Sequence, residues 1–289
     1  MKRKVLVIAI AVVAFAGALM FALYPIVSTA YSEKHQSQIH TEHQAAVQEA
    51  DNEALTLSWE EAIAYNEILW SRVYTDNEFS KETLRDASKD YWAQLNPGEN
   101  GIMGYVRIPK IEVMLPIYHG TDVGVLEQGV GHLLGTSLPV GGDSTHTVLT
   151  AHSGMASQKM FSDLPQMEVG DVFYIEVLDQ VLAYQVDQIA TVLPHETEHL
   201  KIEEAQDRCT LVTCTPFGIN THRLLVRGTR IPYEEEQMIL IQEERQLPHV
   251  STWEGAYIKG VLLGGAIAAA LLLVVLVIGI YRRHRREKN

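Results

Sequence analysis

Two side chains in the segment from Cys209 to Arg230 could do chemistry together. The segment reads CTLVTCTPFGINTHRLLVRGTR. β-Branched and aliphatic residues at Thr210–Thr213 and Leu224–Val226 predict two strands. The loop between them contains residues that a strand interior would not tolerate, namely Pro216, Gly218 and Asn220. A strand, a loop and a returning strand are therefore expected.

Cys214 lies where the first strand ends and Arg223 lies where the second begins, so the two side chains can face each other. An Arg side chain stays protonated at physiological pH and cannot act as a general base. It can favour a nearby thiolate and stabilise a developing oxyanion. The pair predicts nucleophilic chemistry at Cys214, and it still lacks an acid/base group. Thr213, the preceding residue, is a further candidate for contact with a substrate.

Position along the chain selects His152 from the twelve histidines as the acid/base candidate. It follows the predicted strand His146–Ala151, so it has the same strand-end placement as Cys214. His222 is next to Arg223 and should face away from Cys214, because neighbours in a strand point to opposite faces.

The remaining histidines are not expected to carry chemistry. His119 and His132 lie in glycine-bearing loops, where a structural role is favoured over a place in a pocket. His195 and His199 lie in an acidic, exposed loop, and no pair of cysteines has the spacing of zinc ligands. Neither a metal site nor a cofactor is predicted.

Two apolar stretches predict membrane spans. Val5–Tyr24 and Gly260–Ile280 carry no charge, and each is long enough to cross about 30 Å of hydrocarbon as a helix. Lysine and arginine residues precede the first and follow the second, which places both ends in the cytoplasm and the chain between them outside. A cleavable signal peptide is the alternative for the first stretch.

The external part of the chain is acidic and contains both cysteines. Its formal charge is near −20, so nucleic acid is not an expected partner. Cys209 and Cys214 are five residues apart in one predicted strand, with Cα atoms roughly 16 Å apart and side chains on opposite faces. They cannot form a disulfide there. A free external thiol indicates a function for Cys214, and Cys209 is predicted to be a core or edge residue.

The rest of the chain predicts helices followed by a barrel. Ser32–Glu53 is polar, typical of a stalk or loose helix. Ser58 and Glu61 have the spacing of a capping box before an amphipathic helix, and a second helical segment should extend to about Leu95. Seven or eight short strands without strand-helix alternation then favour a closed β-barrel. The strands are expected at Gly104–Ile108, Ile111–Ile117, His146–Ala151, Val172–Leu178, Ala183–Val192, Arg208–Thr213 and Arg223–Ile231.

Three motifs resemble a known family. TLVTCTPFGINTHRLLVRG is similar to the signature of sortases, specifically the pilin-polymerising class C. GIMGYVRIPKIEVMLPIYHGT from Gly101 and GVGHLLGTSLPVGG from Gly129 resemble the same class, as do two spans around the domain. The resemblance covers about Trp59 to Ile231.

The resemblance implies a membrane-anchored cysteine transpeptidase of Gram-positive bacteria on an eight-stranded β-barrel. It implies that Cys214 is the nucleophile, His152 the general acid/base, and Arg223 the stabiliser of the oxyanion or substrate. Enzymes of this kind cut an LPXTG-type sorting signal of a pilin or surface protein between Thr and Gly. They then pass the acyl group to a lysine amine of the next pilin.

The sequence departs from the family pattern at three places. Class C enzymes usually carry an Asp-Pro-aromatic lid motif, whereas this chain has Asp76-Asn77-Glu78-Phe79, so Asp76 and Phe79 are the lid candidates. His152 lies in Thr-Ala-His-Ser-Gly, where Gly-His-Arg-Gly is common. Phe217 replaces the usual Tyr.

The predicted organisation has seven parts, and the predicted function has rivals. Residues 1–4 and 282–289 are cytoplasmic tails, 5–25 and 260–281 are spans, 26–100 form the external helical and lid region, 101–232 form the catalytic barrel, and 233–259 are an acidic linker. The rivals are a sortase that attaches proteins to peptidoglycan, a hydrolytic cysteine protease, and an inactive membrane-tethered binding domain.

Overall fold

The computed structural model describes residues 2–76, 91–155, 158–233, 259–261 and 263–265. The chain divides into two compact units. One comprises Leu23–His249, and the other comprises Met1–Ala22 with Val250–Asn289. The described residues of the second unit are helical. The first unit holds every residue on which the catalytic prediction depends.

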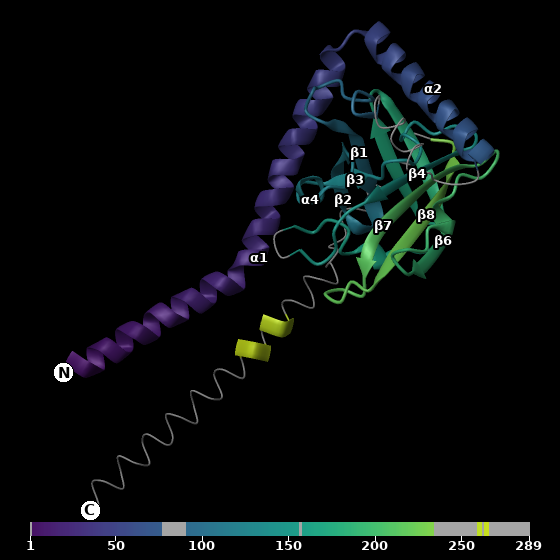
Figure 1. Cartoon of the computed structure of the whole chain (residues 1–289). Coiled ribbons are helices and arrows are strands. Elements are labelled where there is room, and N and C mark those ends of the chain that lie inside the picture. The colour runs from purple at the N-terminus through teal and green to yellow at the C-terminus, as the bar shows by residue number, and fades with distance from the viewer. Residues whose placement is uncertain (1, 77–90, 156–157, 234–258, 262, 266–289) are drawn as a thin grey trace, which may run out of the picture. The chain divides into compact units, whose positions relative to one another are not determined.

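A closed barrel of eight strands forms the larger unit (Figure 1). Around the barrel the order is β1-β2-β3-β4-β7-β8-β6-β5. The strands are β1 (Ile102–Ile108), β2 (Val113–His119), β3 (Val130–His132), β4 (Thr145–Thr150), β5 (Val172–Val177), β6 (Gln180–Val192), β7 (Asp207–Thr215) and β8 (His222–Ile231). Short helical elements connect some of them, namely α4 (Val123–Leu126) and the 3-10 turns Pro109–Ile111, Leu164–Gln166 and Glu198–Leu200.

The structure confirms the predicted closed β-barrel and corrects several boundaries. Strand β3 was not expected, because it follows Gly129 and contains Gly131, which is typical of a loop. His119 and His132 are consequently the last residues of strands rather than loop residues. Residues 109–111 form a 3-10 turn, so the second strand begins at Val113.

Alternation along the strands divides the barrel wall into an inner and an outer face. On β7, Cys209 and Leu211 belong to the main core, whereas Val212 belongs to a smaller apolar cluster with Val148 and Leu225. The main core also contains large aromatic side chains that are fully buried, including Phe161, Phe173 and Tyr184. Burial of this apolar surface is the main favourable contribution to the barrel's stability.

Two helices precede the barrel. Helix α1 runs from Lys2 to Glu49 and helix α2 from Asn52 to Asp76 (Figure 1). The polar segment predicted as a stalk or loose helix is therefore mostly helical. The predicted capping box at Ser58 is wrong, because α2 begins six residues earlier.

Specific polar contacts fix both helices to the barrel. The buried amide of Asn66 in α2 donates 3.1 Å to the carbonyl of Leu138 and accepts 2.7 Å from its N–H. His40 in α1 packs edge-on against Tyr105, with ring centroids 4.6 Å apart, and its Nε2 lies 3.5 Å from a carboxylate oxygen of Glu176. These bonds satisfy polar groups that burial would otherwise leave unpaired.

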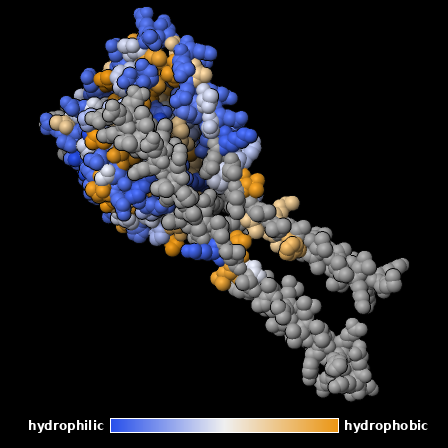
Figure 2. Space-filling view, turned by 180° about the vertical axis from the view of Figure 1, so that it is seen from behind, coloured by the Kyte–Doolittle hydropathy of each residue, from blue (hydrophilic) through white to orange (hydrophobic). Residues whose placement is uncertain are grey.

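Polar side chains predominate on the surface around the barrel. Figure 2 shows mainly hydrophilic residues on the visible face, with hydrophobic residues scattered among them. This agrees with the acidic composition of the segment between the two apolar stretches.

The two predicted membrane spans remain predictions. Within the part of the chain that the structure describes, no helix combines the length and hydropathy of a membrane span. Most of the predicted second span lies outside the described residues. Residues 77–90, which include Phe79 and most of the predicted second helical segment, also lie outside them.

The buried His132, the last residue of β3, is hydrogen-bonded on both ring nitrogens in its neutral form. His132 is fully buried, its Nε2 donates 2.8 Å to the carbonyl of Ser137, and its Nδ1 lies 2.9 Å from the hydroxyl of Tyr91. That hydroxyl accepts 2.9 Å from the N–H of Gly120. Both ring nitrogens are thus satisfied with one proton on the ring. A second proton would have to be accommodated inside the core.

This network predicts how the fold responds to acid. Burial lowers the pKa of His132 from 6.5 to about 4. Between these values the unfolded chain binds a proton that the folded chain excludes, so the free energy of unfolding falls as pH drops from about 6.5 to about 4. We expect His132→Gln to be less stable at neutral pH but to lose up to about 3 kcal/mol less over this interval. Chemical denaturation of the full-length chain at several pH values measures this difference.

The exposed His195 provides the matched control. His195→Gln should retain the wild-type dependence of unfolding free energy on pH. If His132→Gln also retained it in full, the buried imidazole would not be a source of acid sensitivity.

Candidate active site

Strand pairing brings Cys214 and Arg223 together as the sequence predicted. In the antiparallel pair of β7 and β8, Cys214 is directly opposite Arg223. Residues directly opposite each other in such a pair carry their side chains on the same face. The guanidinium donates to the carbonyls of Asn220 and His222, at 3.2 and 3.1 Å, which holds it at the start of β8. A permanent positive charge is therefore held at the start of β8, on the residue directly opposite Cys214.

Cys214 lies on the outer face of the barrel wall. It shares this face with Val212, two residues earlier, and Arg223 shares it with Leu225. Val212 and Leu225 form an apolar cluster with Val148 and Val192. This cluster lies next to the candidate site on the same face. Cys214 itself is partly exposed.

His152 lies beside the same strand end. In the parallel pair of β4 and β7, Thr150 aligns with Val212, and the N–H of Ala151 donates 3.1 Å to the carbonyl of Val212. Two residues further along each strand are His152 and Cys214. His152 is partly exposed, and its carbonyl accepts 3.0 Å from the N–H of the buried Phe161. The structure thus places His152 in the strand-end position that the sequence predicted.

Two hydroxyl groups join the backbone around His152 to the backbone around Cys214. Thr213 is buried, and its hydroxyl donates 2.8 Å to the carbonyl of Ala151. Ser153 donates 2.7 Å from its hydroxyl to the carbonyl of Cys214. Thr213 was a candidate for substrate contact, and its hydroxyl is directed to the neighbouring strand. The contact of Ser153 was not foreseen, and a hydroxyl directly after His152 is the only signal that the sequence offered.

An aromatic ring from the loop between β7 and β8 covers part of the His152 loop. Gly154 has a positive φ of +80°, and a Cβ built there would lie 3.1 Å from the ring of Phe217. Glycine therefore allows both the turn and the close approach of the ring. Phe217 and Ile219 remain exposed at this rim.

The other cysteine is part of the core. Cys209 is fully buried and free, and burial raises the pKa of its thiol well above the usual range. It points to the inner face, while Cys214 points to the outer face, so the two cannot form a disulfide. The sequence prediction for this pair is confirmed. His222 pairs with Thr215 and therefore faces away from Cys214, also as predicted.

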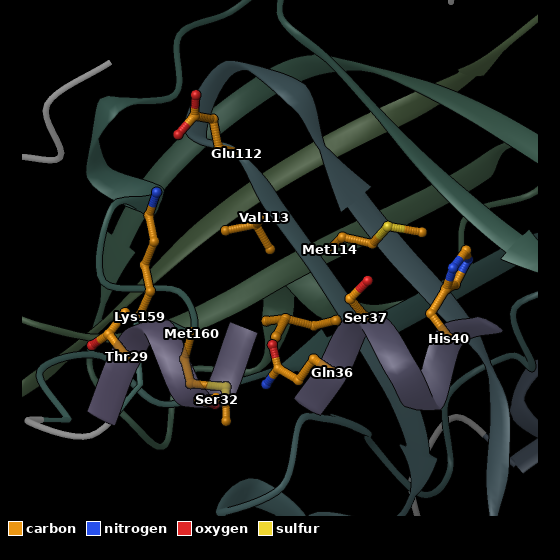
Figure 3. A pocket seen from close by; sticks show the side chains of 11 residues that line it. Thr29, Ser32, Gln36, Ser37, His40, Glu112, Val113, Met114, Lys159 and Met160 are labelled. Carbon is orange, nitrogen blue, oxygen red and sulfur yellow. The ribbon is translucent and has the colours of Figure 1, made fainter. Parts of the chain in front are cut away.

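A separate cavity lies against helix α1 rather than at the candidate site. It has a volume of about 390 Å³ and is lined by polar residues of α1 and by residues of β2 and the His152 loop, including Met114 and Lys159 (Figure 3). None of Cys214, His152 and Arg223 lines it. Its lining offers no nucleophile paired with a base, so it is not the predicted catalytic site.

The structure describes one of the two predicted lid residues. Asp76 is the last residue of α2, and Phe79 lies outside the described residues.

Within the described parts of the chain, no cluster of three or more His, Cys, Asp or Glu side chains could hold a metal ion.

Comparison with known proteins identifies a family-level likeness. A sequence profile of the sortase domain matches residues 106–231. Sortase D of Bacillus subtilis (strain 168) is 28% identical over 142 residues, covering 48% of this chain and 69% of that protein. Other curated relatives are sortases A, and the matches span 59 to 73% of their lengths.

Solved structures are more similar still. Sortase C1 from Streptococcus agalactiae is 42% identical, with a TM-score of 0.62, covering 68% of this chain and all of that chain. Sortase C from Clostridium perfringens, solved with the C-terminal cell wall sorting motif, is 40% identical, with a TM-score of 0.58 and the same coverage of both chains.

Proposed function

Because the chain belongs to the sortase family, we propose that it is a class C transpeptidase that joins pilin subunits through Cys214. The observation that carries the proposal is the pairing of Cys214 with Arg223 at the strand end to which the His152 loop is bonded. Similarity to several sortase C structures at 40 to 49% identity supports the class.

The proposed substrate is an LPXTG-type sorting signal of a pilin or surface protein. Support comes from the C. perfringens relative, whose structure is described with a cell wall sorting motif. The site is suited to a peptide, because Cys214 is partly exposed on an outer face and apolar side chains are exposed nearby at Phe217 and Ile219.

In the first proposed step, the thiolate of Cys214 attacks the Thr carbonyl of the sorting signal. A carbon–sulfur bond forms and the Thr–Gly amide bond breaks, while His152 gives its proton to the departing Gly amine. The guanidinium of Arg223 stabilises the negative charge that develops on the carbonyl oxygen. The product is a thioester between Cys214 and the shortened protein.

In the second proposed step, a lysine amine of the next pilin attacks the thioester. A new amide bond forms, the carbon–sulfur bond breaks, and His152 takes the proton that the amine loses. The thiolate and the protonated imidazole are restored. One amide replaces another, so the exchange needs no external source of energy, which suits an enzyme outside the cell.

The proposed location is the outer side of the cell membrane, with both chain ends in the cytoplasm. The charge distribution around the two apolar stretches supports this arrangement. The family resemblance supports Asp76, the last residue of α2, and Phe79 as the proposed lid residues.

The acyl-enzyme is the most direct test of the proposed activity. Full-length protein is mixed with an LPXTG-type peptide in the absence of amine, and the mass of each cysteine-containing peptide is measured. We expect an acyl adduct on Cys214, its loss in Cys214→Ala, and no adduct on the buried Cys209. An adduct elsewhere, or none on the wild type, would refute the proposal.

The group that accepts the acyl chain distinguishes the proposed function from its rivals. With acceptor amines present, a class C enzyme should give an isopeptide bond to a pilin lysine. A bond to a peptidoglycan amine would identify a cell-wall-attaching sortase instead. Free carboxyl product despite abundant amine would identify a hydrolytic protease.

A matched pair of arginines tests the role of Arg223. We expect Arg223→Lys to lower kcat about 100-fold with little change in KM, because a lysine cannot reproduce a guanidinium fixed toward the oxyanion. Arg227 lies four residues further along β8 and forms two bonds with Asp187, at 3.0 and 2.8 Å. Arg227→Lys should keep near-wild-type kcat in the same peptide assay, and equal losses in the two variants would contradict the assignment.

A further inference from the structure

Ser153 interacts with the nucleophile strand at a point where regular strand pairing ends. Strand β4 stops at Thr150, and the last bond of this parallel ladder runs from the N–H of Ala151 to the carbonyl of Val212. In a continued parallel ladder, the next bond on this side of β7 would fall on the carbonyl of Cys214. It is the hydroxyl of Ser153 that donates to this carbonyl, at 2.7 Å.

The hydroxyl thus holds the chain after His152 against β7 by a side-chain bond at the end of the strand. Thr213 provides the complementary bond on the other side of His152, from its hydroxyl to the carbonyl of Ala151 at 2.8 Å. The residue before the nucleophile is bonded to the residue before the histidine, and the residue after the histidine is bonded to the nucleophile. Together with the backbone bond from Ala151 to Val212, these two bonds hold the two backbones at a fixed separation.

The rest of the His152 loop is held by bonds that do not involve Cys214. The carbonyl of His152 accepts from the N–H of Phe161 at 3.0 Å, and the N–H of Gly154 donates to the hydroxyl of Ser162 at 3.0 Å. Ser153 is the described residue of this loop whose side chain is bonded to the backbone of Cys214. Its loss would leave the loop closed on itself but less firmly fixed to the nucleophile.

We propose that Ser153 is a positioning residue that fixes the His152 imidazole relative to the Cys214 sulfur through the hydrogen bond between its hydroxyl and the Cys214 carbonyl. This inference rests on the proposed function. Proton delivery to the leaving amine depends on this geometry, and a misplacement of about 1 Å can cost a factor of about 100 in rate. Ser153 itself touches no reacting atom in this account.

Two substrates with different leaving groups distinguish a positioning role of Ser153 from a general effect on protein stability. An amide substrate needs a proton on its departing amine, whereas a peptide thioester carries a leaving thiolate that departs without one. We expect Ser153→Val to lower the rate of acylation by the LPXTG-type amide, read as release of the Gly peptide, about tenfold with KM changed less than about twofold. The rate of acylation by the matched thioester, read as release of its thiol, should be nearly unchanged. Ser153→Thr has nearly the same side-chain volume as Ser153→Val but keeps the hydroxyl. It should therefore show the wild-type ratio of the amide rate to the thioester rate.

Ser162→Ala is the control within the loop, because it removes the bond to Gly154 and keeps the link to Cys214. It should leave the ratio of amide to thioester rates at the wild-type value. The ratio does not depend on the fraction of folded protein, so a partly unfolded variant still gives a result. Equal slowing of both substrates by Ser153→Val, no slowing of either, or the same change in Ser162→Ala would overturn the inference.

A failure of the proposed function would look different. In that case the wild type itself would form no acyl adduct on Cys214, or would pass the acyl group to water or to a peptidoglycan amine instead of a pilin lysine. An active wild type whose Ser153→Val variant is indistinguishable from it would overturn only the positioning role.

Discussion

The candidate site depends on one constraint, the register in which β7 pairs with both of its neighbours. Pairing with β8 sets Cys214 directly opposite Arg223. Pairing with β4 aligns Thr150 with Val212 and so brings the chain after β4 to the level of Cys214. A shift of one residue in either pairing would turn one partner to the other face of the wall. Because the barrel is closed, neither pairing can slip without disturbing the strands around the whole ring.

The same strand serves the core and the site through simple alternation. Residues of β7 that point inward, including Cys209 and Leu211, are packed in the main core. Residues that point outward lead from Val212 in the smaller apolar cluster to the partly exposed Cys214. The core-facing and outward-facing side chains thereby lie on opposite faces of one strand, which explains why two cysteines five residues apart have different environments.

Much of this arrangement could be predicted from the sequence. The fold class, seven of the strands and the opposed placement of Cys214 and Arg223 followed from alternation and turn residues. Strand β3 was missed because a three-residue strand with glycines gives no periodic signal. The start of α2 was misplaced because a capping pattern at Ser58 occurs inside a longer helix. The bonds of Thr213 and Ser153 could not be foreseen, since each hydroxyl meets a backbone carbonyl on a strand distant in the sequence.

The alignment of residue 152 with Cys214 can be measured directly by a cross-link. Neighbouring strands lie about 4.8 Å apart, within the range of Cα separations that a disulfide spans. In a His152→Cys variant of the full-length chain, mild oxidation should give one disulfide that joins peptides containing residues 152 and 214, while Cys209 stays reduced. If the thiols at 152 and 214 both remained open to alkylation after oxidation, or if either paired with Cys209, the register on which the site depends would be wrong.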